Sequence, residues 1–152
     1  MKTIVVGCDN AAVNLKNEII KFLELQGIKV ENVGCESSDD PTMYPYVAKK
    51  VCNKIIESNF DKQGILVCGT GIGMAITANK FKGIRAAVCH DIFSAERSKL
   101  SNNVNVLCMG ERIIGVGLAK KIIKEWISLK FVDGSSTPKV NSIVSIEDEN
   151  LK

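Results

Sequence analysis

Short apolar runs recur along the chain and predict five buried strands. Each run is rich in Val, Ile, Leu or Ala and is bounded by glycine or polar residues, which is typical of strands that end in turns. The five runs lie at residues 3–7, 28–33, 64–67, 85–89 and 104–109. The longer segments between them carry apolar residues three or four positions apart, which is the spacing of an amphipathic helix.

Helices are expected after each of these strands. Gly27 marks the end of the first helix, and Pro45 marks the start of the second, at Tyr44. The expected helical ranges are 11–26, from 44 onward, 75–80, 91–100, 115–129 and 139–149. In the fifth of these helices, the residues expected to face the core are Leu118, Ile122, Trp126 and Leu129.

The alternation of strands and helices predicts an α/β fold with a parallel sheet between two helical layers. Ligands of such sheets bind at the carboxyl ends of the strands. This edge is expected to gather Asp9, the acidic loop after the second strand, Cys68, His90-Asp91 and residues 102–105. No internal repeat divides the 152 residues, so a single domain over 1–152 is expected.

Composition and charge argue against several classes of protein. With 45% apolar and 24% charged residues, the chain has the composition of an average globular protein. No apolar run approaches the roughly 20 residues that span a bilayer. A strand that begins at residue 3 is expected to leave no room for a signal peptide, which favours a cytoplasmic location. The net charge of +3 is spread along the chain without a basic patch, so neither nucleic acid nor a membrane is an expected partner.

The six cysteines and the single histidine argue against a metal site. No two cysteines have the Cys-x-x-Cys spacing of zinc or redox sites. Most of the cysteines are therefore expected to be small buried hydrophobic residues. No metal is predicted.

The segment from Gly64 to Met74 carries the clearest chemical signal. A buried strand ends at Cys68, and three glycines follow before the next helix. Free backbone N–H groups and the positive end of a helix would then surround the thiol, which suits a phosphate or an enediolate. The same surroundings favour the thiolate, the form of cysteine that acts as base or nucleophile. Together with the carboxylate of Asp9, they would suit proton transfer next to a carbonyl.

Other glycine-rich motifs fit this segment less well. A dinucleotide-binding loop belongs after the first strand, whereas this loop follows the third. A P-loop needs Gly-Lys-Ser/Thr where the chain has Gly73-Met74-Ala75, and a cysteine phosphatase needs an arginine where it has Met74. The alternative that stays open is a purely structural Cys68, buried at a strand end beside glycines that only shape the turn.

Motifs spread over nearly the whole chain occur in an order typical of one family. They are Gly7-Cys8-Asp9, Tyr44-Pro45, Cys68-Gly-Thr-Gly-Ile-Gly73, Ala78-Asn79-Lys80, Gly83-Ile84-Arg85-Ala86, Ser94-Ala95, Asn105-Val106-Leu107 and Gly110-x-Arg112. Together they resemble the family of ribose-5-phosphate isomerase B and galactose-6-phosphate isomerase. The resemblance implies a three-layer Rossmann-like (flavodoxin-like) fold with a five-stranded parallel sheet, and a cofactor-independent aldose–ketose isomerase of a sugar phosphate. It also implies a homodimer or homotetramer with the site at a subunit boundary, and we expect residues 134–152 to pack on a neighbouring subunit.

By this resemblance, the catalytic roles fall to Cys68, Thr70 and Asp9. Cys68 would be the base that moves a proton between C1 and C2 of the sugar. The loop N–H groups would stabilise the enediolate with help from the Thr70 hydroxyl, and Asp9 would bind sugar hydroxyls or assist proton transfer. The other loop residues expected to contact the substrate are Gly69, Gly71, Ile72 and Gly73.

Five further residues are expected to bind the substrate. They are Asn10, Tyr44, Asn102, Arg112 and Lys139. By the resemblance, Tyr44 would line the pocket, Asn102 would contact the sugar, and Arg112 would hold the phosphate through two hydrogen bonds. Lys139 stands where the family has a phosphate-binding arginine, and it keeps the charge without the planar fork.

The chain departs from the family at two histidines. Asn10 and Ser101 stand in place of histidines, and the histidine missing at Ser101 is the one associated with opening a furanose. General acid–base help is worth about 10² to 10⁴ in rate, so its loss matters for a cyclic substrate and not for an acyclic one. The expected substrate is ribose 5-phosphate, as in the family, or, for a diverged paralogue, a tetrulose 4-phosphate or a hexose 6-phosphate. His90 is either a replacement base or an ordinary residue at the start of a helix.

Two hypotheses compete with an isomerase. The altered phosphate residues would permit a catalytically weak subunit that needs a partner chain, and the fold alone would permit a binding module. The intact Cys68 loop argues against both.

Overall fold

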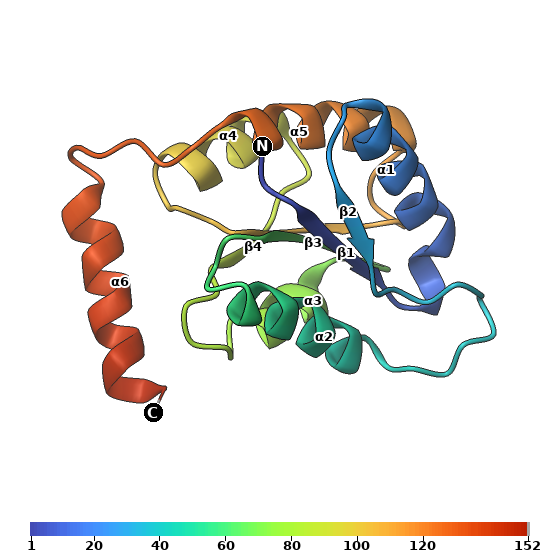
Figure 1. Ribbon diagram of the computed structural model, residues 1–152, viewed down its shortest axis with the longest axis horizontal. Helices are drawn as coiled ribbons and strands as arrows, with labels where there is room; N and C mark the ends of the chain where they lie inside the picture. The colour runs from blue at the N-terminus through green and yellow to red at the C-terminus, as the bar shows by residue number, and fades with distance from the viewer. Residues whose placement is uncertain (152) are drawn as a thin grey trace.

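A computed structural model describes residues 1–151 and contains the predicted five-stranded parallel sheet (Figure 1). The strands are β1 (Ile4–Cys8), β2 (Val30–Asn32), β3 (Gln63–Cys68), β4 (Ala86–Val88) and β5 (Val106–Gly110). They lie in the order β2-β1-β3-β5-β4, and every neighbouring pair is parallel. Cys8 pairs with Val67, and Cys68 pairs with Gly110. The carboxyl ends of β1, β3 and β5 therefore form one edge, with Cys68 at its centre.

Helices cover both faces of the sheet. One face carries α1 (Val13–Leu25), α4 (Ile92–Leu100) and α5 (Val116–Ser128), and the other carries α2 (Tyr44–Glu57) and α3 (Ile72–Ala78) (Figure 1). A short 3-10 helix, η1 (Asn10–Ala12), precedes α1. Gly27, with a φ of 78°, follows the end of α1, and Pro45 lies in the first turn of α2, as predicted. The three-layer α/β fold is confirmed.

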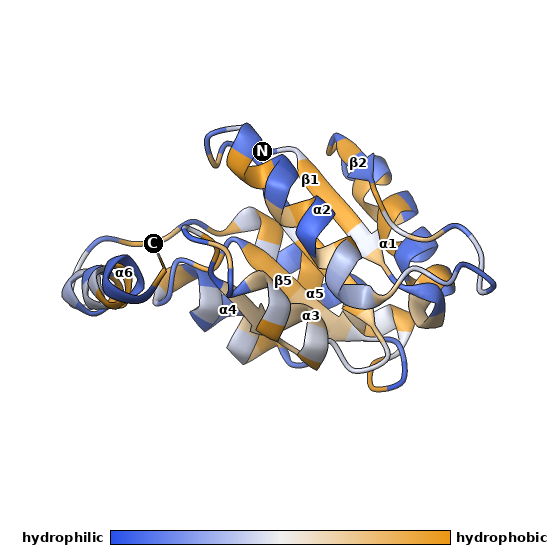
Figure 2. Cartoon of the chain, turned by 90° about the horizontal axis from the view of Figure 1, so that it is seen from below, coloured by the Kyte–Doolittle hydropathy of each residue, from blue (hydrophilic) through white to orange (hydrophobic). Residues whose placement is uncertain are grey.

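The core lies between the sheet and its two helical layers. β1 and β5 are buried along their whole length because helices cover both of their faces (Figure 2). In α2, Val47, Val51 and Ile55 face inward, as predicted. In α5, the buried residues are Ala119, Ile122, Ile123 and Trp126. The prediction for Leu118 was wrong, because it lies outside this stripe and is 43% exposed; Leu129, at the C-cap, is half-buried.

The helix after the glycine loop begins earlier than the sequence pattern predicts. α3 starts at Ile72, and its N-cap is Gly71, which has a φ of 81°. Apolar periodicity could not locate this start, because Ile72 and Ile76 are 56% and 58% exposed. The free N–H groups at the start of α3 therefore follow almost directly after Cys68.

The last helix, α6 (Thr137–Asn150), stands beside the α/β body (Figure 1). Glu147 Oε1 accepts a hydrogen bond from the Gly83 N–H at 2.8 Å, and Lys82 Nζ lies 2.9 Å from the Asp148 carboxylate. Only Val140 of this helix is buried, and its other large apolar residues are exposed. That residues 134–151 pack on a neighbouring subunit stays a prediction, and residue 152 lies outside the described residues.

None of the helices in residues 1–151 is long and apolar enough to cross a membrane. In the same part of the chain, no three His, Cys, Asp or Glu side chains are grouped so that they could hold a metal ion. The cytoplasmic location and the lack of a metal or cofactor stay predictions from the sequence.

Candidate active site

Cys68 lies at the carboxyl end of β3, in the middle of the sheet edge. It is 6% exposed, and its Sγ accepts a hydrogen bond from the Gly71 N–H at 3.0 Å. An N–H group directed at the sulfur stabilises negative charge on it. The predicted thiol at a strand end, beside a loop of N–H groups, is therefore present.

The other five cysteines are buried thiols. Burial raises the pKa of Cys8 and of Cys52 to about 12. It also raises the pKa of Cys35 and of Cys89, and it raises the pKa of the fully buried Cys108 well above its usual range. These five groups stay protonated at neutral pH and pack as small hydrophobic residues.

The loop after Cys68 depends on glycine for its shape. A β-carbon at Gly71 would lie 2.9 Å from the Met109 backbone, and the φ of 81° there favours glycine as well. Thr70 Oγ1 accepts from the Ile72 N–H at 3.3 Å, which leaves the hydroxyl hydrogen free to donate. Among the first N–H groups of α3, those of Gly73 and Met74 lack an intrahelical acceptor and are available to an anion.

Arg112 and Tyr44 lie on two sides of this loop. The N–H groups of Glu111 and Arg112 donate to the carbonyls of Cys68 and Gly69 at 2.9 and 3.1 Å. A β-carbon at Gly69 would lie 3.4 Å from Arg112 Nη1, and one at Gly73 would collide with the Tyr44 ring. Both side chains are exposed, so the guanidinium and the phenol are accessible to a ligand.

Asp9 and Asn10 lie at the same edge, directly after β1. The half-buried Asp9 caps η1 by accepting the Ala11 N–H at 3.0 Å. Asn10 Nδ2 donates to the Asp40 carbonyl at 3.0 Å and so connects the end of β1 to the acidic loop. The structure thus brings Asp9, Asn10, Tyr44, Arg112 and the Cys68 loop to one edge of the sheet.

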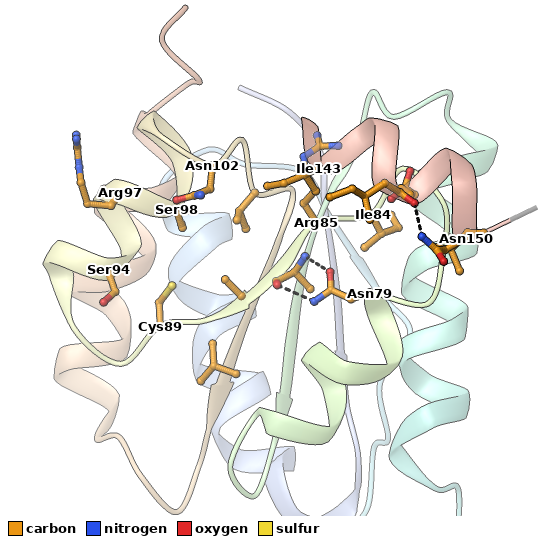
Figure 3. Close-up of a pocket in the computed structure, with 17 residues that line it drawn as sticks. Asn79, Ile84, Arg85, Cys89, Ser94, Arg97, Ser98, Asn102, Ile143 and Asn150 are labelled. Atoms are coloured by element: carbon orange, nitrogen blue, oxygen red, sulfur yellow. Dashed lines mark hydrogen bonds between the residues drawn. The ribbon is translucent and has the colours of Figure 1, made fainter. Parts of the chain in front are cut away.

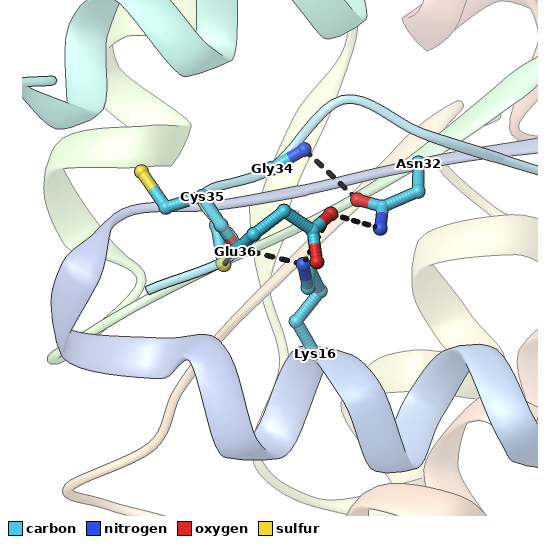
Figure 4. A network of polar contacts seen from close by, with 6 residues as sticks. Lys16, Asn32, Gly34, Cys35 and Glu36 are labelled. Carbon is cyan, nitrogen blue, oxygen red and sulfur yellow. Dashed lines mark hydrogen bonds and ion pairs between the residues drawn. The ribbon is translucent and has the colours of Figure 1, made fainter. Parts of the chain in front are cut away.

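Lys16 supports this edge, although the sequence pattern did not identify it. Its side chain is fully buried, and Nζ donates to the Cys35 carbonyl at 2.7 Å and lies 3.3 Å from Glu36 Oε1 (Figure 4). Asn32 Nδ2 donates to the same carboxylate at 2.7 Å. These contacts fix the start of the loop that carries Asp40. No feature of the sequence marks Lys16 as buried, because lysine normally lies on the solvent face of a helix.

Two predicted substrate residues do not lie at this edge. Asn102 belongs to the turn between α4 and β5, at the amino ends of the strands, where the Gly64 N–H donates to the Asn105 carbonyl at 2.9 Å. The expected place of residues 102–105 was therefore wrong, because α4 returns the chain to the opposite edge of the sheet before β5 begins. Lys139 is exposed in the first turn of α6. Within one chain, neither residue joins Cys68.

Asn102 instead lines a groove of about 740 Å³ between β4, α4 and α6 (Figure 3). Arg85 and Ser98 line its polar part, and Ile143 lines its apolar part. Asn79 closes one end of β4, because its amide donates to the Ala86 carbonyl at 2.9 Å and accepts from the Ala86 N–H at 2.8 Å. None of the predicted catalytic residues lines this groove.

His90 lies at the carboxyl end of β4 and is already hydrogen-bonded. Its Nε2 accepts the Gly110 N–H at 2.9 Å. Burial lowers the pKa of His90, an effect that Asp91 opposes, so the ring is neutral at pH 7 and carries its proton on Nδ1. No lone pair is then free, which contradicts His90 as a replacement base. The expected helix start is confirmed, because Asp91, next to His90, is the N-cap of α4 and accepts the Ser94 N–H at 2.6 Å.

Comparison with known proteins relates this fold and edge to one family. A family model described as Ribose/Galactose Isomerase matches residues 4–143. D-erythrulose-4-phosphate isomerase 2 of Mycolicibacterium smegmatis is 48% identical over 147 residues, which cover 95% of this chain and 96% of that protein. Ribose-5-phosphate isomerase B of Escherichia coli is 42% identical over 147 residues, 97% of each chain. The solved structure of Clostridium thermocellum ribose-5-phosphate isomerase B matches with a TM-score of 0.91 and 37% identity, over 97% of this chain and 98% of that chain.

The chain therefore belongs to the ribose/galactose isomerase family. It is a sugar-phosphate aldose–ketose isomerase, an intramolecular oxidoreductase of carbohydrate metabolism. The resemblance found in the sequence motifs is confirmed at this level.

Proposed function

We propose that this enzyme interconverts a tetrulose 4-phosphate and the matching tetrose 4-phosphate, with Cys68 as the base. The observation that carries the proposal is the position of the Cys68 sulfur, at a strand end with the Gly71 N–H 3.0 Å away. Such an arrangement supports a thiolate next to groups that can stabilise an oxyanion.

The proposed reaction moves protons and leaves the carbon chain intact. In the ketose-to-aldose direction, the Cys68 thiolate removes a proton from C1 and leaves an enediolate. The N–H groups of Gly73 and Met74 and the Thr70 hydroxyl stabilise the negative oxygen. A proton passes from O1 to O2 with the help of Asp9, and the Cys68 thiol, whose proton exchanges with solvent, then protonates C2. No cofactor takes part.

A four-carbon substrate fits the missing ring-opening histidine. A sugar whose C4 oxygen carries the phosphate cannot close a furanose ring, so it needs no group at Ser101 to open one. The Mycolicibacterium smegmatis relative is named for D-erythrulose 4-phosphate, which supports this choice. Arg112 lies beside Gly69 and would hold the phosphate close to the reacting carbons.

The proposal includes a homodimer or homotetramer, acting in the cytoplasm. Asn102 and Lys139 can contact a substrate at Cys68 only from a second copy of the chain. Ile143 and Ile146 of α6 are 45% and 60% exposed, and Ile72 and Ile76 expose apolar surface beside the loop, which favours a neighbouring subunit there.

Ribose 5-phosphate is the second candidate substrate, and hexose 6-phosphates are the third. The Escherichia coli relative is named ribose-5-phosphate isomerase B, and it matches this chain over 97% of each sequence.

Turnover of a panel of phosphates tests the proposal: D-erythrulose 4-phosphate, D-ribose 5-phosphate and D-tagatose 6-phosphate. The expected kcat/KM is highest for the tetrulose, by at least about 10²-fold over the pentose, because ring opening lacks its acid–base group. Ser101→His is the matched variant, and it should raise turnover of ribose 5-phosphate without raising that of the tetrulose. Equal or better turnover of ribose 5-phosphate by the unaltered enzyme would overturn the substrate proposal. If Cys68→Ala turned over the tetrulose 4-phosphate as fast as the unaltered enzyme, the proposed role of Cys68 as the base would be overturned.

A further inference from the structure

The side chain of His90 continues the β4–β5 ladder past the end of β4. The last backbone bond of this ladder runs from the Cys89 N–H to the Cys108 carbonyl, at 3.1 Å. The next β5 N–H directed toward β4 is that of Gly110, and it donates to the imidazole Nε2 at 2.9 Å. Gly110 is buried, and a buried N–H without an acceptor is costly. The imidazole therefore takes the place of a strand carbonyl.

Gly110 in turn packs directly against the Cys68 loop. A β-carbon at Gly110 would lie 2.5 Å from Thr70 Cα and 2.6 Å from the Gly69 carbonyl oxygen. The two residues after Gly110 donate their N–H groups to the carbonyls of Cys68 and Gly69, and the second of them is Arg112. A shift of Gly110 would thus move both the anion-binding loop and the guanidinium.

The same turn is held from its other side by Glu111. Its Oε1 accepts the Leu15 N–H at 3.1 Å, at the start of α1. The turn over residues 110–112 is therefore fixed between α1 on one side and His90 on the other. Loss of either bond would remove one of the two side-chain contacts that supplement the backbone bonds of the turn to Cys68 and Gly69.

We propose that His90 is a positioning residue for the isomerase reaction. It acts through the Gly110 N–H, which it holds in place with Nε2, and it does not touch the substrate. By fixing Gly110 it sets the positions of the loop N–H groups against the enediolate and of Arg112 against the phosphate. This role rests on the proposed function of the Cys68 loop.

Two variants of His90 separate this role from simple packing. His90→Leu keeps an apolar side chain but has no acceptor, whereas His90→Gln supplies an amide oxygen that can accept the Gly110 N–H. Asp91→Ala is the control, because it removes the N-cap of the adjacent helix and leaves the bond between His90 and Gly110 in place.

We expect His90→Leu to lower kcat/KM for the preferred substrate by about 10- to 100-fold, because small misplacements of catalytic groups are costly. Most of the fall should be in kcat, and a four-carbon hydroxamate phosphate that mimics the enediolate should lose affinity by a similar factor. His90→Gln should stay within about fivefold of the unaltered enzyme, since the acceptor is restored. Asp91→Ala should unfold more easily and keep its kcat.

Three kinetic results would overturn the proposal. They are an unchanged kcat/KM in His90→Leu, an equal loss in His90→Gln, and an equal loss of kcat in Asp91→Ala. Amide hydrogen exchange supplies a readout that does not depend on activity. In His90→Leu, the Gly110 N–H should exchange faster and the amide signals of Gly69 and Gly71 should shift. If the unaltered enzyme turned over no sugar phosphate, the proposed function would fail, and unchanged exchange at Gly110 would separately show that His90 does not position the turn.

Discussion

Two regions of the molecule differ in how many of the proposed site residues a single chain brings together. They are the carboxyl edge of the sheet and the β4–α6 side. At the carboxyl edge, the Cys68 loop packs against the β5 backbone, and Tyr44 and Arg112 lie at its sides. On the β4–α6 side, a groove of about 740 Å³ is open, and Ile146 is 60% exposed. The groups proposed for proton transfer thus lie together within one chain, whereas Asn102 and Lys139 lie apart from them.

This difference separates two kinds of mutational effect. Changes at the carboxyl edge should act on the chemical step, because the groups there are already in place. Changes on the β4–α6 side should act through assembly, because only a second copy of the chain could bring those residues to the substrate.

The largest effect is expected from removal of the thiol at the carboxyl edge. Cys68→Ala should lower kcat/KM by about 10³-fold, because the general base is lost. Cys52→Ala is the control, since it removes a fully buried thiol from α2 without touching the loop. Steady-state kinetics on the preferred sugar phosphate measure both variants. A comparable loss in Cys52→Ala would mean that packing, and not the base, accounts for the fall.

The next largest effect is expected from a change in the backbone geometry of the Cys68 loop. Gly71→Ala and Gly27→Ala both place a side chain at a φ near 80°, but only the first meets the backbone of Met109, at 2.9 Å. Left-handed backbone costs about 1–2 kcal/mol per residue, so both variants should lose that much free energy of unfolding. Gly71→Ala should also lose about 10²-fold in kcat, because the loop must shift. Normal turnover by Gly71→Ala would show that the loop geometry is not required.

A smaller effect is expected from the exposed face of α6. Replacing Ile143 and Ile146 by serine should shift the assembly toward monomer in analytical ultracentrifugation and lower activity by about 10-fold at low enzyme concentration, because an apolar contact is lost. Leu25→Ser, at a residue that is 77% exposed on α1, is the matched control. A fully active monomeric enzyme would show that one chain suffices for catalysis and that the β4–α6 side contributes nothing to the carboxyl edge of a second chain.

The smallest effect is a pH dependence of stability at the amino edge. The hydrogen bond from Lys62 and the charge of Lys62 lower the pKa of Glu31. The folded pKa lies below the unfolded one, so this pair stabilises the fold above the unfolded pKa, and its contribution is lost as pH falls through the folded pKa. Urea unfolding should show that Lys62→Met removes at most about 1 kcal/mol at pH 7 and less at pH 3, without a change in kcat. An equal loss of free energy of unfolding at pH 7 and pH 3 would show that the pair of Lys62 and Glu31 is not the source of the stabilisation.

Much of the fold could be predicted because local patterns determine it. The β-branched runs, Gly27 and Pro45 placed the strands and two helix boundaries, and the order of glycines after Cys68 located the loop. Other features depend on tertiary packing. The start of α3 at Ile72 was missed because its apolar residues face outward. The place of Asn102 could have been predicted from the order of the elements, because a turn that leads from a helix into a parallel strand lies at the amino end of that strand.

The supporting contacts could not be predicted at all. Lys16 is buried because the Cys35 carbonyl and Glu36 accept from or pair with its amine, and the ring of His90 is hydrogen-bonded because the Gly110 N–H lies 2.9 Å from Nε2. These partners are far apart in the sequence, so no spacing rule connects them. The residues proposed for the chemistry were therefore easier to place than the residues that hold them.

Isomerisation in heavy water, followed by NMR, tests most directly whether Cys68 moves a proton through an enediolate. With D-erythrulose 4-phosphate, the unaltered enzyme should introduce one deuterium at the carbon next to the carbonyl, and Cys68→Ala should introduce it about 10³-fold more slowly. Isomerisation that leaves the product free of deuterium, or exchange in Cys68→Ala at the rate of the unaltered enzyme, would contradict a cysteine-catalysed proton transfer.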